Sequence, residues 1–279
     1  MKTLPLIVSL LTAAAVAPPL VRGLREQGFA RENYRGAPVA FPAGIAIPVA
    51  ALLALAPVTV LHEWSDDDVL LAETGTAVLF VTGVALLGLI DDLVGTDASA
   101  RGWRGHARAA ASGGLSTGAI KAAGTLGLAL FVMSATGRDA ADELLLGAGV
   151  LVLATNLFNL LDLRPGRSGK ALVLLGAALV AGSRDADPLW TLGLFLGPVL
   201  VLLPLDLREV GMLGDTGSNA VGAVAGLWLL MSLSLTGQAI AVAVMAAITV
   251  YGEFRSISEV VDRAPVLRHL DSLGRISHA

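Results

Sequence analysis

The sequence contains no cysteine and carries little charge. Without cysteine, the chain can form no disulfide, no thiolate metal site and no cysteine nucleophile. Charged residues make up 15% of the 279 residues, whereas a soluble domain carries roughly 25%. Hydrophobic residues reach 55%, and the mean hydropathy is +0.75. These values exclude an ordinary soluble domain and indicate a membrane protein.

Long apolar runs, interrupted by Gly and Pro, fill the sequence, and they exclude a β-barrel, whose strands would show short alternating segments. Nine runs approach the length of about 20 residues that a membrane-spanning helix needs, although the sixth is short. They lie at about residues 4–21, 41–61, 69–90, 118–136, 143–161, 170–182, 188–205, 217–235 and 238–253. We predict one all-α polytopic bundle of about nine spans over residues 1–279, with a short cytoplasmic tail from about residue 254. Residues 1–20 lack a convincing basic start and cleavage site, so they are predicted to be a retained first span.

The distribution of basic residues predicts the orientation, because Lys and Arg gather on the cytoplasmic side of membrane proteins. With the N-terminus outside, 16 of the 19 Lys and Arg residues lie inside, and only Lys2, Arg138 and Arg184 lie outside. The acidic loop 63–68 also falls outside. We therefore predict a multi-pass plasma-membrane protein with the N-terminus out and the C-terminus in. Three polar clusters then share the cytoplasmic face.

The first cluster is the adjacent pair Asp91 and Asp92, which ends the apolar run 69–90. The pair sits where the span meets water, because a charge at mid-membrane depth costs several kcal/mol. These acids could simply end a helix, but acids are disfavoured at the negative end of the helix dipole. A structural and a functional interpretation are both open for this pair alone.

The second cluster consists of Asn156, Asn159 and Asp162, which recur every three residues and therefore lie within about 120° of one helix face. Buried amides need partners, and these could be other helices or a ligand. Three such groups in register, including an acid, favour a ligand site. The basic residues that follow form a rim that attracts anions: Arg164, Arg167 and Lys170.

The third cluster, 214–218, contains Asp215 and opens a helix. Free N–H groups and small residues at a helix N-terminus favour a phosphate, although an acid there is usually an N-cap. If Asp215 lies near Asp91 and Asp92, their repulsion is relieved by a raised pKa or by a cation. Oxygen ligands without a His or Cys cluster suit Mg²⁺.

These clusters, taken in order, resemble the signature motifs of the polyprenyl-phosphate N-acetylhexosamine-1-phosphate transferase superfamily, which includes phospho-N-acetylmuramoyl-pentapeptide transferase. The similar segments are Asp91-Asp92, a Gly-Leu-Ser segment at 114–121 that ends in Lys121, the Asn156/Asn159/Asp162 run and 213–218. The resemblance covers roughly residues 20 to 255. It implies transfer of a sugar-1-phosphate from a UDP-N-acetylhexosamine-type donor to a polyprenyl phosphate, with release of UMP, for cell-envelope polysaccharide or peptidoglycan synthesis.

The resemblance also implies a role for each residue. Asp215 would be the principal ligand of Mg²⁺ (Mn²⁺ is the alternative ion), and Asp91 and Asp92 would support the metal or deprotonate the lipid phosphate. Lys121 would meet phosphate. Binding of the nucleotide and its diphosphate would fall to the remaining polar residues: Asn156, Asn159, Asp162, Arg164 and Arg167. The expected partners are the UDP-sugar, the polyprenyl phosphate and membrane lipid; no nucleic acid is expected, and a homodimer is compatible with the sequence.

Two other functions remain open at this point. A His-rich segment typical of the family's last cytoplasmic loop is absent, so a catalytically inactive relative that binds a lipid or a partner is the main alternative. A cation-coupled transporter is the second, but it would place its acids near mid-span. The predicted topology places them at one face instead.

Overall fold

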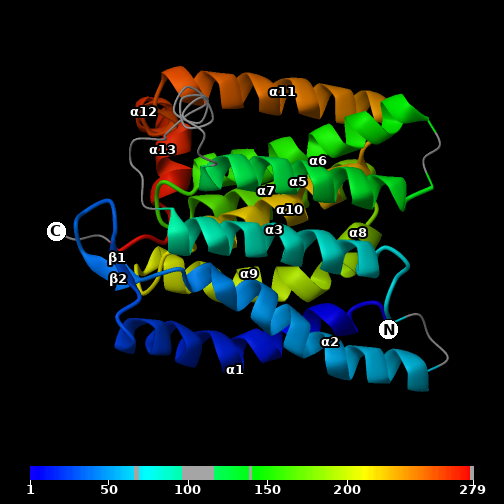
Figure 1. Ribbon diagram of the computed structural model, residues 1–279, viewed down its shortest axis with the longest axis horizontal. Helices are drawn as coiled ribbons and strands as arrows, with labels where there is room; N and C mark the ends of the chain where they lie inside the picture. Colours follow the sequence, from blue (N-terminus) through cyan, green and yellow to red (C-terminus); the bar gives the residue numbers. More distant parts are fainter. Residues whose placement is uncertain (66–68, 96–115, 138–139, 277–279) are drawn as a thin grey trace.

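The computed structural model describes residues 1–65, 69–95, 116–137 and 140–276, and almost all of its regular structure is helical (Figure 1). Residues 66–68 of the acidic loop, Arg138, and Gly114 and Leu115 of the Gly-Leu-Ser segment lie outside the described residues. The helical elements are α1 (Leu4–Glu26), the 3-10 turn η1 (Ala43–Ile45), α2 (Ala46–Trp64), α3 (Thr74–Val94), α5 (Thr117–Ser134), α6 (Ala141–Leu161), α7 (Arg167–Ser183), α8 (Asp187–Thr191), α9 (Gly193–Leu207), α10 (Gly214–Ser232), α11 (Leu235–Phe254), α12 (Ile257–Arg263) and α13 (Pro265–Ser272).

The nine apolar runs of the sequence all fall on helices, which confirms the prediction of an all-α membrane bundle. Six helices of the described chain are long and apolar enough to cross a membrane: α1, η1 with α2, α3, α5, α6 and α11. Helix α9 is apolar but shorter, and α7 has 17 residues. The number of spans and their orientation stay predictions.

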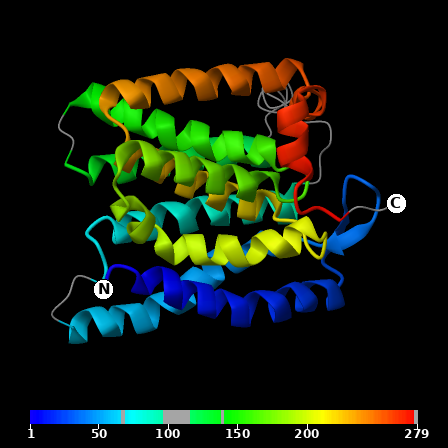
Figure 2. The ribbon, with the colours of Figure 1, turned by 180° about the vertical axis from the view of Figure 1, so that it is seen from behind.

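The two ends of the bundle differ in character. The N-terminus lies at one end, and the C-terminal helices α12 and α13 lie at the other (Figures 1 and 2). At this second end α3 and α6 finish, α10 begins, and most polar side chains of the sequence motifs gather. We call it the polar end.

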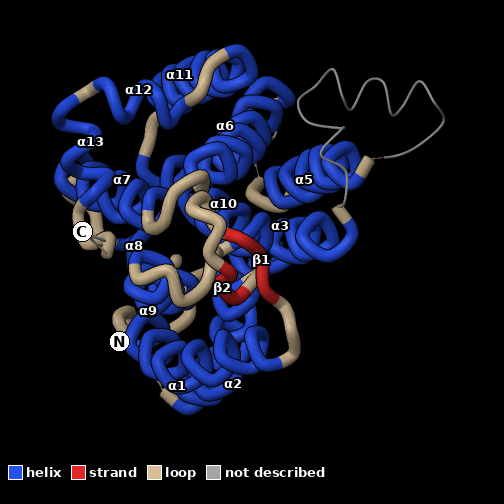
Figure 3. The backbone as a smooth tube through the Cα atoms, turned by 90° about the vertical axis from the view of Figure 1, so that its left-hand side faces the viewer, coloured by secondary structure: helices blue, strands red, loops and turns tan. Residues whose placement is uncertain are grey.

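A short β-hairpin at the polar end was not predicted from the sequence. Strands β1 (Ala30–Glu32) and β2 (Pro38–Ala40) pair antiparallel, with Arg31 opposite Val39. Ala40 also forms a parallel bridge with Gly211, and the Met212 N–H donates to the Ala40 carbonyl at 2.9 Å. The hairpin is therefore attached to the segment just before α10, and it lies in front of the bundle in the end-on view (Figure 3).

Helix α10 runs through the centre of the bundle (Figure 3). Every residue from Thr216 to Leu229 is buried. Its first part is rich in Gly, Ala and Ser, which allow the backbones of neighbouring helices to come close. A motif at the start of α10 is thus placed against α3, α6 and the hairpin at once.

The chain after residue 254 is not a simple tail. Helices α12 and α13 fold back along the polar end beside α7 (Figure 1). The Arg167 guanidinium at the start of α7 donates to both carboxylate oxygens of Asp271, at 2.8 and 3.0 Å, and to Ser258 Oγ at 3.0 Å. A buried, bidentate ion pair therefore holds the C-terminal helices in place.

Candidate active site at the polar end

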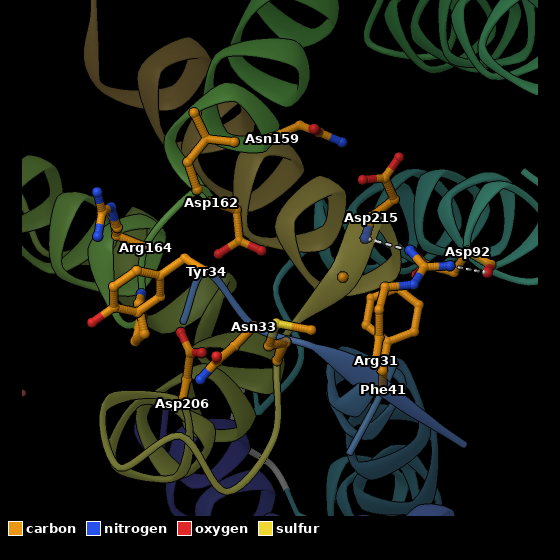
Figure 4. Close-up of a pocket in the computed structure, with 14 residues that line it drawn as sticks. Arg31, Asn33, Tyr34, Phe41, Asp92, Asn159, Asp162, Arg164, Asp206 and Asp215 are labelled. Carbon is orange, nitrogen blue, oxygen red and sulfur yellow. Dashed lines mark hydrogen bonds between the residues drawn. The ribbon is translucent and has the colours of Figure 1, made fainter. Parts of the chain in front are cut away.

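A cavity of about 210 Å³ opens at the polar end (Figure 4). Its walls come from the hairpin, the end of α3, the end of α6 with the loop after it, the end of α9 and the start of α10. The lining residues are Arg31, Asn33, Tyr34, Phe41, Asp92, Asn159, Asp162, Leu163, Arg164, Pro165, Asp206, Met212, Gly214 and Asp215. Members of all three polar clusters of the sequence therefore meet in one place.

Helices α3 and α10 touch closely just beneath this cavity. A Cβ atom on Gly88 would lie 2.4 Å from the Asp215 carbonyl oxygen and 2.7 Å from the Thr216 nitrogen, so only glycine fits there. One turn further along α3, the buried Asp92 carboxylate accepts hydrogen bonds from the backbone N–H groups of Asp215 (2.9 Å) and Thr216 (2.8 Å). It also accepts one from Thr216 Oγ1 at 2.6 Å. Asp92 thus caps the N-terminus of α10, where a negative charge is favourable.

The neighbouring acid, Asp91, has different partners. Its carboxylate lies 2.9 Å from the ammonium group of Lys121, near the start of α5, and the same ammonium pairs with Asp215 on α10. The side chains of Asp91, Lys121 and Asp215 keep 18%, 22% and 32% of their surface exposed. Two carboxylates and one ammonium from three helices therefore form a cluster that solvent and solutes can reach.

The three residues of the second cluster do not all face the cavity. Asn159 and Asp162 line it, and Asn159 Nδ2 donates to Asn219 Oδ1 on α10 at 3.1 Å. Asn156 instead donates to Thr249 Oγ1 on α11 at 3.3 Å. The expectation that all three form one binding face therefore needs correction: Asn156 joins α6 to α11.

Asp162, at the end of α6, is a cavity acid surrounded by other carboxylates. Burial raises the pKa of the Asp162 carboxyl well above its usual range, and the charges of Asp206, Asp215 and Asp92 raise it further. Its side chain points into the cavity between the hairpin and the start of α10 (Figure 4). Protonated Asp162 can donate a hydrogen bond to an anionic ligand, which a carboxylate cannot do.

The basic rim is also divided between two places. Arg164 lines the cavity. Arg167 does not, because its buried guanidinium is bound to Asp271 and Ser258. Lys170 donates to three backbone carbonyls at the end of α13, those of Leu270, Asp271 and Leu273. The proposed substrate contact at Arg167 is therefore replaced by a structural one.

Several cavity residues escaped the sequence analysis. Asp206 is a buried acid at the end of α9 that accepts a hydrogen bond from the Gly166 N–H at 2.7 Å. The sequence did contain a signal for Asp206, because this acid directly follows the apolar run 188–205. Arg31, Tyr34 and Phe41 come from the hairpin region, and nothing in a charged loop sequence identifies which of its residues face a cavity.

The carboxylates fit a magnesium ion in part. Within the residues that the structure describes, no group of three or more His, Asp or Glu side chains is arranged to hold a metal ion. Mg²⁺ does not need such a cage, since one or two carboxylates commonly bind it together with waters and substrate phosphates. Asp91 and Asp215 both pair with the ammonium group of Lys121, so their carboxylates lie close enough together to be ligands of this kind.

Comparison with known proteins gives no further guide to the activity. No family model matches the sequence, and no curated protein matches it either.

Proposed function

We propose that the protein is a membrane transferase that moves a sugar-1-phosphate from a UDP-N-acetylhexosamine-type donor to a polyprenyl phosphate and releases UMP. The observation that carries the proposal is the meeting of Asp91, Lys121 and Asp215 beside a polar cavity at one end of an apolar bundle. A lipid phosphate can reach such a place from the membrane, and a nucleotide can reach it from water.

The chemistry proposed requires positioning and charge neutralisation more than covalent assistance. An oxygen of the lipid phosphate attacks the β-phosphorus of the donor, the bond from that phosphorus to the bridging oxygen breaks, and UMP leaves. When bound at Asp215 and Asp91, Mg²⁺ would neutralise the phosphate charge. Lys121 supplies a further positive charge for the phosphates, and Asp91 is the acid placed to accept the proton of the lipid phosphate.

Asp92 is less suited than Asp91 to proton transfer. Its two carboxylate oxygens already accept three hydrogen bonds from the start of α10. We therefore assign to Asp92 the positioning of Asp215, a division of the pair that the family resemblance left open.

The cavity is small for a whole nucleotide-sugar. Pockets that enclose drug-sized ligands measure about 300–1,000 Å³, whereas this cavity measures about 210 Å³. We therefore propose that it would hold only part of the donor, including the diphosphate. Asn159 and Asp162 would bind this part from one wall.

The test is an assay of UMP release by the purified protein, with a panel of UDP-sugars and polyprenyl phosphate. We expect turnover that requires Mg²⁺ or Mn²⁺ and stops in EDTA. Asp215→Asn should reduce turnover by orders of magnitude, whereas Asp142→Asn, an exposed acid at the start of α6, should not. Full activity in chelator would refute the metal role, and nucleotide binding without any turnover would support the inactive relative.

The proposal also requires the polar end to face the cytoplasm of a plasma-membrane protein. Topology reporters fused in the 63–68 loop and at residue 279 should then report the outside and the cytoplasm respectively. If both reported the same compartment, a cytoplasmic nucleotide could not be the donor in this arrangement.

A further inference from the structure

Two arginines at the cavity are each stacked on an aromatic ring. The guanidinium carbon of Arg31, on β1, lies 3.9 Å from the ring centroid of Phe41. The guanidinium carbon of Arg164, in the loop after α6, lies 4.3 Å from the centroid of Tyr34. Both distances are within the range of about 6 Å for a cation–π contact. The two pairs stand on opposite sides of the cavity (Figure 4).

Stacking fixes a guanidinium group without using its hydrogen bonds. The five N–H donors of Arg lie in the plane of the group, whereas the ring covers only its face. Arg31 uses one donor, Nη2, on the Asp92 carbonyl at 3.2 Å. The side chain of Arg164 makes no hydrogen bond or ion pair with any part of the chain that the structure describes. Among the described residues their other donors have no hydrogen-bond partner, so a ligand could use them.

Two other arginines at the polar end form ion pairs with carboxylates. Arg167 pairs with Asp271, and Arg35 pairs with Glu209. Arg35 also lies over the Tyr34 ring, 5.4 Å from its centroid, on which Arg164 stacks more closely. Arg31 and Arg164 differ from these two because each has a ring contact and no ion pair with a carboxylate of the described residues.

The cavity acids already have partners. Asp92 accepts three hydrogen bonds from α10, Asp206 accepts one from Gly166, and Asp215 pairs with Lys121. Asp162 is the remaining acid, and its raised pKa favours the neutral form. Arg31 and Arg164 are the two basic residues in the cavity lining, and neither guanidinium forms an ion pair with a carboxylate of the described residues. An anion with two charged groups could therefore contact one guanidinium from each side of the cavity.

We propose that Arg31 and Arg164 form a clamp for the diphosphate of a nucleotide, with Phe41 and Tyr34 as supports that hold each guanidinium in place. Arg presents a planar fork that matches phosphate oxygens in a bidentate manner. A ligand with two linked phosphates can meet an arginine from each wall at once. This inference rests on the proposed function, since it names the residues that would hold the donor's diphosphate.

The experiment measures binding of UDP and UMP by isothermal titration calorimetry to the purified full-length protein in detergent. Arg31→Gln and Arg164→Gln should each weaken UDP binding by about 10- to 100-fold, because each loses charge-assisted hydrogen bonds. The effect on UMP should be smaller, since UMP has one phosphate. Arg25→Gln, which removes an exposed charge near the end of α1, is the matched control and should leave both affinities unchanged.

The aromatic supports provide a second set of variants. Phe41→Leu and Tyr34→Leu keep the arginines but remove the rings, and we expect a loss of UDP affinity of about 3- to 10-fold, because each variant loses a cation–π contact that positions a guanidinium. Arg31→Lys and Arg164→Lys should also bind UDP weakly, because lysine keeps the charge but cannot form the two parallel hydrogen bonds of a guanidinium. Recovery of full affinity in the lysine variants would overturn the clamp.

A third arm separates the two phosphate sources, the nucleotide and the lipid. Farnesyl phosphate serves as a short lipid probe, and its affinity should change little in Arg31→Gln and Arg164→Gln. If those variants lost farnesyl phosphate and kept UDP, the assignment to the nucleotide would be wrong. Absence of UDP binding by the wild-type protein would also overturn it.

Failure of the clamp can be told from failure of the transferase. Arginine-dependent UDP binding without UMP release in the assay would refute the transferase and retain the clamp. UMP release with unchanged UDP affinity in both glutamine variants would retain the transferase and refute the clamp.

Discussion

Replacing Asp92 and Asp91 separately by Asn should produce two different kinds of defect. The Asp92 carboxylate accepts bonds of 2.9, 2.8 and 2.6 Å from the first residues of α10. An Asn side chain has one carbonyl oxygen, so its NH₂ group must face at least one of these donors. Asp92→Asn therefore loses at least one hydrogen bond and the charge at the helix N-terminus.

The magnitude follows from these contacts. A hydrogen bond to a charged group contributes about 1.5–3 kcal/mol, and a charge at a partly buried helix end contributes up to about 2 kcal/mol. Together they predict a loss of about 2–5 kcal/mol. At about 2–4 °C per kcal/mol for a chain of this size, the apparent Tm should fall by about 4–20 °C.

Asp91→Asn is the matched control, one residue away. Lys121 keeps its pair with Asp215 in this variant, and a partly exposed ion pair contributes about 1 kcal/mol or less. The apparent Tm should therefore change by only a few degrees, while UMP release should fall strongly. The reverse order of stabilities, or an equal fall in Tm for both variants, would show that Asp92 does not hold α10 in place. Tryptophan fluorescence during heating in detergent measures both values.

Three further predictions concern the residues around the cavity. Asp271→Ala leaves Arg167 buried without its carboxylate, which should lower the free energy of unfolding by about 3–5 kcal/mol and expose the α12–α13 segment to limited proteolysis. An unchanged digestion pattern together with lost UDP binding would show that Arg167 binds the substrate. Asn159→Ala should weaken a UDP-sugar by about 1.5–3 kcal/mol, whereas Asn156→Ala, which faces Thr249 on α11, should leave affinity intact; equal losses would contradict this division. UDP affinity should fall as pH rises through the elevated pKa of Asp162, because ionised Asp162 repels the phosphates of UDP. Its charge then adds to those of Asp206, Asp215 and Asp92, and Arg167 is the opposing positive charge. The same pH profile in Asp162→Asn would refute this.

The helices were predictable because apolar length is a strong and local signal. Eight of the nine runs correspond to one helix each, including the short sixth run, which corresponds to α7, and the run 188–205 covers α8 and α9. The meeting of Asp92, Asn159, Asp162 and Asp215 was also predictable, because each lies at a helix end and the order of the spans places those ends together. What the sequence could not predict depends on contacts between distant residues.

Arg167 and the hairpin illustrate this limit. The basic rim predicted from sequence treated Arg164 and Arg167 alike, but the partner of Arg167 is 104 residues away, on a helix whose docking no local pattern announces. The hairpin has strands of three residues, and its stability depends on hydrogen bonds from the segment before α10. Propensity alone cannot identify strands of this length.

The different fates of Asp91 and Asp92 follow from helix geometry once the neighbours of α3 are known. Residues four apart share a helix face, so Asp92 lies on the face of Gly88, where α10 comes closest. Asp91 lies on the same face as Leu87, and this face contacts α5. A Cβ atom on Gly124 of α5 would lie only 2.8 Å from Leu87 Cδ1. The pair therefore diverges, with one acid directed to the backbone of α10 and the other to Lys121 on α5. Two adjacent acids at the end of an apolar run consequently do separate tasks, and the small residue one turn earlier indicates which acid is structural.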